Sequence, residues 1–134
     1  MSRETVALVE SAFEAWNRGD VAGFAAHAAD DVVWLEVSGW LEQEGREVRG
    51  RERLERNLLG LLDAWESYRL ELEEVHEAGE RVVAVVRELA RGRTSGAEVD
   101  SMWGYLITVT DGKLARVEAY RDPAAALAAA GLAQ

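Results

Sequence analysis

Glu36 is the residue of this 134-residue sequence whose setting best suits acid–base chemistry. It lies in the run 32–37, whose β-branched and aromatic residues predict a strand. Successive side chains of a strand point to opposite faces, so Glu36 shares a face with Val32 and Trp34. Apolar neighbours penalise the charged form of a carboxyl, which is how a general acid or base is tuned. The alternative is that Glu36 lies at the exposed end of the strand or pairs with an arginine.

Large aromatic side chains are the second candidate for a binding site. Helical spacing and strand alternation place four of the five tryptophans on faces that we expect to point inward. With Phe13 and Ile107 they are expected to line a pocket for a flat, apolar molecule; the four are Trp16, Trp34, Trp65 and Trp103. The alternative is that some of these rings fill the core. The fifth, Trp40, falls in a predicted loop, and its role is left open.

Two adjacent residues of opposite charge, Arg87 and Glu88, interrupt the apolar strand predicted over 82–91. Alternation sends one of them inward and the other outward, but the sequence does not decide which. The inward residue is a buried charge that needs a partner, and Glu36 and Tyr105 are candidates for that role.

Composition excludes several classes of site. The net charge of −10 and a pI of about 4.7 disfavour nucleic acid as a partner. Without cysteine there is no disulfide, no thiolate nucleophile and no cysteine–zinc site. We expect no metal, since His27 and His76 lack ligand spacing, and no cofactor, since no phosphate-loop or dinucleotide motif occurs. The absence of a serine-elbow motif leaves nucleophilic serine catalysis without support.

The location follows from the absence of targeting signals. The N-terminal residues lack the basic and apolar regions of a signal peptide, and no apolar run approaches 18 residues. We therefore expect a cytoplasmic protein that does not enter a membrane.

Hydrophobic periodicity predicts the elements that must position these residues. Helices are expected over 3–17, from Asp20 to about 28, from Leu54 to Trp65 and from Pro123 to about 130, and strands over 32–37, from Tyr68 to about 77, and over 82–91, 97–110 and 113–120. Residues 38–50 are predicted to form a loop, and Asp111-Gly112 a two-residue hairpin turn. Early helices followed by a run of antiparallel strands predict an α+β fold in a single domain over 1–134.

Three segments carry a resemblance to a known family. They are the helical run from Phe13 to Asp20, the strand entry from Ala29 to Trp34, and the ending from Asp111-Gly112-Lys113-Leu114 through Tyr120-Arg121-Asp122. With these residues the chain resembles the nuclear transport factor 2-like (NTF2-like) superfamily, and within it the SnoaL-like polyketide cyclases and ketosteroid isomerase-like proteins. The likeness covers nearly the whole chain.

The resemblance implies a fold and an assembly. The fold is a curved antiparallel sheet forming a cone that the N-terminal helices close, as in cystatin-like and NTF2-like proteins. The assembly is commonly a homodimer formed through the outer face of the sheet. Because this superfamily hosts many activities, the resemblance is specific for fold and not for reaction.

The resemblance also implies roles for two residues. Ketosteroid isomerases place their proton-shuttling carboxylate at the end of this first strand, where Glu36 stands. They place an oxyanion donor where Tyr105 falls, counted back from the Asp111-Gly112 turn; the alternative is that Tyr105 only packs. Ala12 replaces the helix tyrosine that completes the isomerase oxyanion hole, so steroid isomerisation is not expected.

Two functions of different classes remain open. The first is a cofactor-independent isomerase or cyclase acting on a small apolar carbonyl compound, with Glu36 moving a proton and Tyr105 stabilising an enolate. The second is a non-catalytic module for binding a small apolar molecule or for dimerisation. The first requires both side chains in one pocket, whereas the second predicts Glu36 to be exposed or in a salt bridge.

Overall fold

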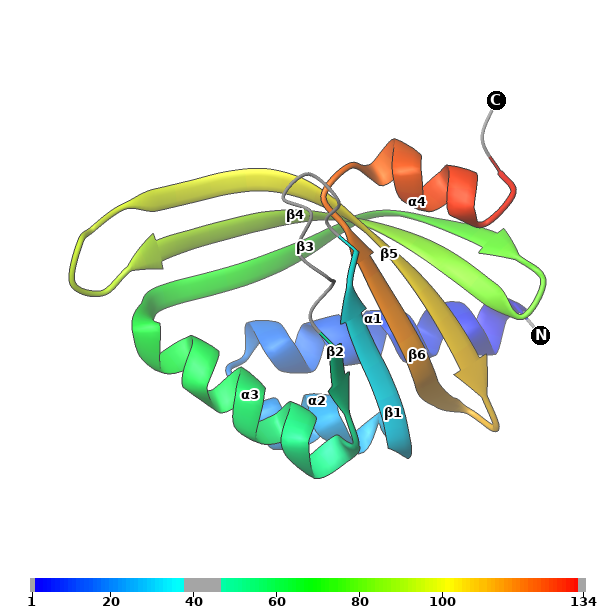
Figure 1. The fold of residues 1–134 in the computed structure, drawn as a ribbon, viewed down its shortest axis with the longest axis horizontal. Helices are drawn as coiled ribbons and strands as arrows, with labels where there is room; N and C mark the ends of the chain where they lie inside the picture. The colour runs from blue at the N-terminus through cyan, green and yellow to red at the C-terminus, as the bar shows by residue number, and fades with distance from the viewer. Residues whose placement is uncertain (1, 38–46, 133–134) are drawn as a thin grey trace.

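The protein is built on one six-stranded sheet with helices on both faces (Figure 1). The computed structural model describes residues 2–37 and 47–132. Its elements are α1 (Ser2–Asn17), α2 (Val21–Ala26), β1 (Ala28–Glu36), β2 (Glu47–Arg49), α3 (Arg51–Ala64), β3 (Trp65–Ala78), β4 (Arg81–Gly92), β5 (Glu98–Thr110), β6 (Lys113–Tyr120) and α4 (Pro123–Ala129). Trp40 lies outside the described residues. Within those residues, no helix combines the length and the apolar character that crossing a bilayer requires.

The strand order is β2-β1-β6-β5-β4-β3, and one pairing departs from the expected antiparallel pattern. β1 and β6 are parallel, so the sheet is mixed; the other neighbouring strands are antiparallel. Parallel strands need a long crossover connection. Here β2, α3 and three strands separate β1 from β6 along the chain, which provides that crossover. The α+β fold class is confirmed, and the sheet is open.

Several element boundaries differ from the prediction. The second helix ends at Ala26, and Ala28, which was expected within it, begins β1. Part of the predicted loop 38–50 forms β2, an edge strand in which Val48 pairs with Trp34. Three residues with charged ends carry no detectable alternation, which is why the sequence did not reveal this strand. The third helix ends at Ala64, because Trp65 has an extended backbone and pairs with Gly92 at the start of β3.

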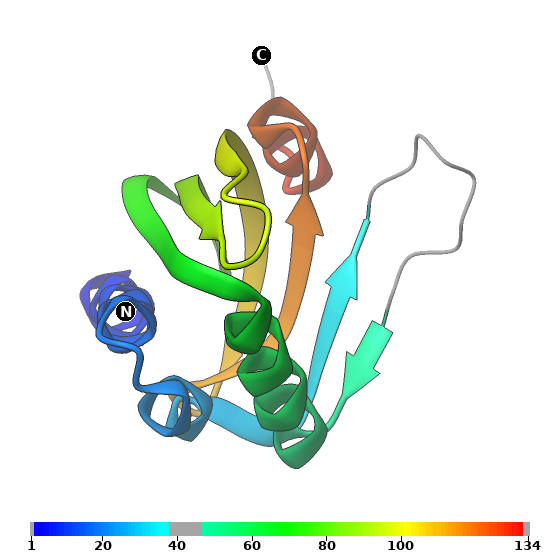
Figure 2. The same cartoon turned by 90° about the vertical axis from the view of Figure 1, so that its left-hand side faces the viewer.

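The main core lies between the sheet and α1 and α2. Figures 1 and 2 show α1, α2 and α3 on one side of the curved sheet and α4 on the other. Val9, Phe13 and Trp16 recur at helical spacing on α1 and are buried, as the periodicity predicts. They pack with alternate strand residues, including Val32 and Val86, so the inner sheet face is apolar along much of its length.

Two predicted helix N-caps and one predicted hairpin turn are confirmed. The Asp20 carboxylate accepts a hydrogen bond from the Gly23 backbone nitrogen (2.9 Å) and caps α2. Asp122 caps α4 in the same way, with Pro123 at the first helical position. Asp111 and Gly112 both have positive φ angles, +54° and +74°, as the predicted hairpin turn requires.

A second, smaller core holds α4 on the outer sheet face. Ala126 of α4 is fully buried and packs with Val83, Val85 and Leu106. The helix approaches so closely that a Cβ atom on Gly104 would lie 2.7 Å from the Ala126 Cβ and 2.8 Å from the Pro123 Cα. The homodimer expected through this outer face stays a prediction.

We expect Gly104→Ala to destabilise the protein by about 1–3 kcal/mol, because the added methyl group overpacks the contact with α4. Gly60→Ala is the matched control, since its new methyl group meets nothing within 4 Å on the surface of α3. That control should be neutral or stabilise by up to about 1 kcal/mol. Urea denaturation of both variants measures the difference, and equal stabilities would show that the approach of α4 does not depend on a glycine.

Candidate functional site

A cavity of about 160 Å³ lies between the inner sheet face and the helices. Every element except α4 contributes to its wall. The lining combines aromatic rings, aliphatic side chains, one amide and two carboxylates: Trp16, Phe24, Trp34, Glu36, Val48, Leu54, Asn57, Leu58, Leu61, Tyr68, Leu70, Glu88, Trp103, Tyr105 and Ala119. The volume is close to that of a ~150 Å³ apolar cavity known to hold benzene. The site therefore has the dimensions of a small organic molecule.

Glu36 and Tyr105 both line this cavity. Glu36 ends β1 opposite Ala119 of β6, on the same face as Trp34. The Glu36 side chain is partly buried, and it forms no hydrogen bond or ion pair with the other residues that the structure describes. It is thus neither fully exposed nor held by an arginine within that part of the chain.

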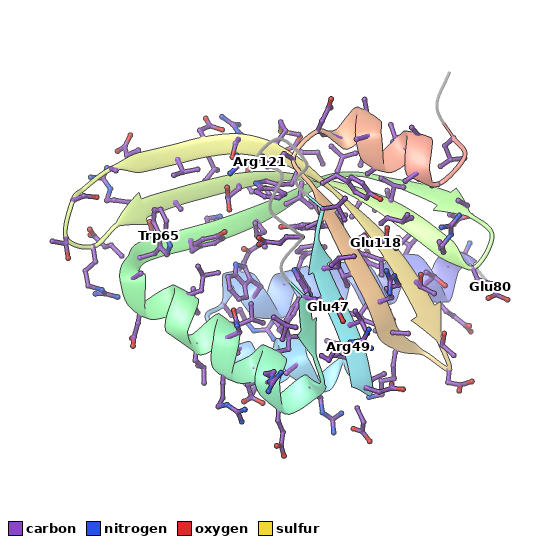
Figure 3. The ribbon with its side chains drawn as sticks, in the orientation of Figure 1. Glu47, Arg49, Trp65, Glu80, Glu118 and Arg121 are labelled. Carbon is purple, nitrogen blue, oxygen red and sulfur yellow. The ribbon has the colours of Figure 1, made fainter. Side chains whose placement is uncertain are left out.

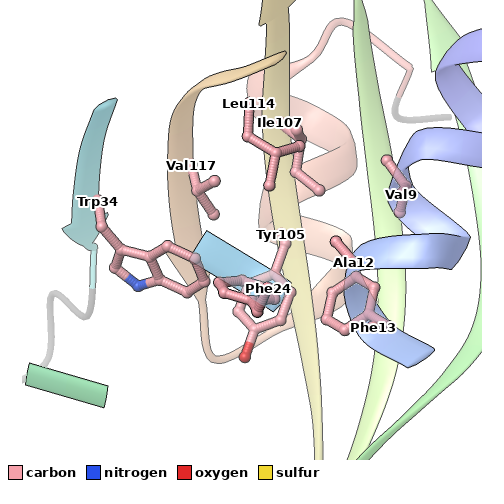
Figure 4. Close-up of a pocket in the computed structure, with 9 residues that line it drawn as sticks. All are labelled: Val9, Ala12, Phe13, Phe24, Trp34, Tyr105, Ile107, Leu114 and Val117. Carbon is pink, nitrogen blue, oxygen red and sulfur yellow. The ribbon is translucent and has the colours of Figure 1, made fainter. Parts of the chain in front are cut away.

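Tyr105 lies among aromatic rings at the centre of the inner sheet face. Its ring stacks with Phe13 at 5.9 Å and 10° and meets Trp34 edge-on at 5.9 Å and 62°. The hydroxyl points away from Ile107 and Leu114 (Figure 4). Burial, followed by the negative charges of nearby carboxylates, raises the pKa of Tyr105 above its ordinary value. The phenol therefore stays protonated near neutral pH and is available as a hydrogen-bond donor.

Glu88 is the inward member of the charged pair on β4. One carboxylate oxygen, Oε1, accepts hydrogen bonds from the Ser101 hydroxyl and the Trp103 indole nitrogen, each at 3.0 Å. The other, Oε2, accepts a hydrogen bond from the Tyr68 hydroxyl. The sequence suggested Glu36 and Tyr105 as partners of this buried charge, but neither forms a hydrogen bond with Glu88. Polar groups of β3 and β5 take that role, because these two strands pair with β4 on either side.

Arg87 points to the opposite face of the sheet. Its guanidinium donates two hydrogen bonds to Asp100, at 2.9 and 2.7 Å, outside the cavity. The strand thus separates the two charges, with the cation outside and the carboxylate inside. On the inside, burial and the hydrogen bond to Glu88 raise the pKa of Tyr68.

The structure divides the six predicted pocket residues into three groups. Trp16, Trp34 and Trp103 line the cavity. Phe13 and Ile107 line an adjoining apolar space of about 10 Å³, no larger than one water molecule needs, and are core residues (Figure 4). Trp65 is not among the described residues that line either space. It lies where α3 passes into β3 (Figure 3) and packs edge-on against Tyr68 at 5.8 Å.

Sequence reasoning missed several polar groups of the cavity. Asn57 lies on the face of α3 that also carries Leu54 and Leu61, a helical spacing visible in the sequence. Tyr68 was placed on a strand but not assigned to a pocket, although it precedes Leu70 on one face of β3. Ser101 has no signal of its own, because only its pairing with Glu88 across the sheet gives it a role.

A cation approaches the aromatic wall from the end of β6. The guanidinium carbon of Arg121 lies 5.2 Å from the centroid of the Trp103 ring, within the range of a cation–π contact. Arg121 is exposed, at the point where the chain leaves the sheet for α4 (Figure 3). It does not line the cavity, whose described charged residues are both acidic.

Comparison with known proteins identifies the family. The SnoaL-like domain matches residues 9–117. This chain belongs to the SnoaL-like family. No curated protein matches it.

Solved structures similar to this SnoaL-like protein share its fold. An NTF2-like protein from Burkholderia xenovorans is 31% identical, with 96% of this chain and 95% of that chain covered and a TM-score of 0.72. An NTF2-like protein from Burkholderia pseudomallei is 21% identical, with 93% and 95% covered and a TM-score of 0.77. A proposed polyketide cyclase from Xanthomonas campestris is 24% identical, with 96% and 97% covered and a TM-score of 0.72.

The buried phenols predict a loss of stability in alkali. The pKa values of Tyr68 and Tyr105 are raised in the folded protein, whereas an unfolded tyrosine titrates near 10. Their contribution is therefore complete below about pH 10 and is lost as the pH rises further, because the unfolded chain then releases protons that the folded chain keeps. Each such tyrosine lowers the free energy of unfolding by about 1.4 kcal/mol per pH unit in that range.

Urea denaturation between pH 9 and 11 tests this dependence. Tyr105→Phe should make the total decline between pH 9 and 11 smaller by about 1.4 kcal/mol relative to the wild type. The other ionisable groups are common to both proteins, so their contributions cancel in the comparison. A variant with the same slope as the wild type would mean that Tyr105 ionises as readily in the folded protein as in the unfolded chain.

Proposed function

We propose that this SnoaL-like protein is a cofactor-independent acid–base enzyme acting on a small, largely apolar carbonyl compound. The proposal rests on one observation: Glu36 and Tyr105, a carboxylate without a described partner and a protonated phenol, line the same small cavity. Proton abstraction beside a carbonyl needs these two groups, a base at the carbon and a donor at the oxygen.

The reaction begins when the Glu36 carboxylate takes a proton from the carbon next to the carbonyl. The electrons of that C–H bond form an enolate, whose oxygen accepts a hydrogen bond from the Tyr105 hydroxyl. In an isomerisation, the substrate carries a C=C bond beside the reacting carbon, so the enolate is a dienolate and Glu36 returns its proton to the far carbon as that double bond shifts. In a cyclisation, the enolate carbon attacks a second carbonyl carbon of the substrate, and the new alkoxide takes the proton. Neither route needs an oxidant, a reductant or a cofactor.

The remaining wall suits a flat substrate. Rings of Trp16, Trp34 and Phe24 provide apolar surface on several sides and restrict the entry of water. The likeness to a proposed polyketide cyclase is consistent with a carbonyl substrate. The alternative function is a non-catalytic module that holds a small apolar molecule in the same cavity, and a direct measurement of proton transfer distinguishes the two.

The test is the exchange of protons next to a carbonyl in heavy water. A flat bicyclic ketone such as 2-tetralone exchanges its activated methylene protons for deuterium, which proton NMR follows directly. Wild-type protein should accelerate this exchange. Glu36→Gln should lower the acceleration by roughly 100-fold or more and Tyr105→Phe by roughly 100-fold, since these variants remove the base and the oxyanion donor.

Glu71→Gln is the control for this experiment. Glu71 lies on the outer sheet face opposite Arg87, so its loss changes the net charge equally and leaves the cavity intact. Exchange that is no faster with wild type than with Glu36→Gln, although the ketone shifts the tryptophan resonances, would establish the binding module and reject the enzyme.

A further inference from the structure

The charge of the cavity is one-sided. Of the described residues that line it, Glu36 and Glu88 carry a charge, and no lysine, arginine or histidine is among them. Arg87, the cation nearest to Glu88 along the chain, points to the other sheet face and is bound to Asp100. The two carboxylates therefore face the cavity without a positive side chain in its wall.

Neutral donors hold Glu88 in place, and none of them supplies a positive charge to balance the carboxylate. The three groups that hydrogen-bond its carboxylate are a phenol, a hydroxyl and an indole, none of which is ionised. Three hydrogen bonds fix its position, so its negative charge cannot turn away toward solvent. A carboxylate in such surroundings is stabilised further by a positive charge that enters the same space.

The aromatic walls are suited to the same kind of charge. Faces of tryptophan and tyrosine rings attract cations, and aromatic cages recognise quaternary ammonium groups in this way. Trp103, whose indole nitrogen binds Glu88, already interacts with the Arg121 guanidinium at 5.2 Å. Trp34 and Tyr105 add ring surface on the inner side of the sheet, at 5.9 Å from one another.

We infer that the cavity binds a small ligand carrying a positively charged nitrogen, an ammonium or quaternary amine. This inference rests on the proposed function for its site and narrows the substrate to a carbonyl compound with an amine. Two carboxylates then divide the work: the fixed Glu88 balances the cation, and Glu36 exchanges the proton. The sequence predicts a flat, apolar ligand, and the inferred ligand differs from it by carrying a charged nitrogen.

A pair of isosteric probes tests the charge alone. Choline and 3,3-dimethylbutan-1-ol have the same shape and hydroxyl group, and they differ in a charged nitrogen against a neutral carbon. Indole resonances in ¹H–¹⁵N NMR spectra report binding at Trp16, Trp34 and Trp103. Choline should shift these resonances with a dissociation constant at least tenfold lower than that of the neutral alcohol. Equal affinity, or no shift with choline at millimolar concentration, would overturn the inference.

Variants locate the preference in the cavity. Glu88→Gln and Glu36→Gln should each reduce the preference for choline at least threefold and leave the affinity for the alcohol unchanged. Glu71→Gln, which lowers the net negative charge equally on the outer face, should keep the full preference. If Glu88→Gln does not fold, Glu36→Gln still decides, because no described residue depends on its side chain for a hydrogen bond or an ion pair.

The outcome is separable from that of the proposed enzyme. Choline has no carbon acid beside a carbonyl, so its binding reports recognition of charge and not catalysis. A preference for choline without ketone exchange would retain this inference and reject the proposed enzyme. Ketone exchange without a preference for choline would retain the enzyme and reject the charged ligand.

Discussion

Strands β4 and β5 have both faces covered where α4 packs on them, and the end of that cover decides where the charges of the cavity lie. On the inner face Ala84 packs with the main core, and on the outer face Val83 packs beneath α4. A strand buried on both sides must be apolar at every position, as parallel strands often are. Beyond α4 the cover ends on one side, so Arg87 reaches solvent and Asp100 while Glu88 stays within.

The same constraint explains which parts of the fold were predictable. Amphipathic helices, capping aspartates and the Asp111-Gly112 turn are written in local sequence, and they appear where expected. The parallel pairing of β1 with β6 is a long-range contact that depends on how the whole chain closes, and no local period encodes it. β2 has only three residues, too few for alternation to be distinguished from a loop.

The site was predictable in part for similar reasons. Glu36 follows from alternation along β1, and the resemblance to isomerases suggested Tyr105; both lie at the cavity. Alternation could not orient Glu88, because the preceding residues are apolar on both faces and give no phase. The missing information was the position of α4. It covers Val83 and Val85, so the outer face of β4 is as apolar there as the inner face. Trp65 was misplaced because its helix ended one residue earlier than its periodicity suggested.

The carboxylates and the phenols of the cavity form one coupled electrostatic arrangement. Negative charge on Glu88 and Glu36 opposes ionisation of Tyr105, so the presence of the acidic groups keeps the phenol a donor. Conversely, the Tyr68 hydroxyl stabilises the charge of Glu88 by donating a hydrogen bond to it. The same hydrogen bond raises the pKa of Tyr68, so the phenol keeps its proton. A base and a donor usually require opposite environments, one favouring the anion and the other the neutral acid. Here a single environment serves both, because the carboxylates Glu36 and Glu88 supply the field that keeps the nearby phenols protonated.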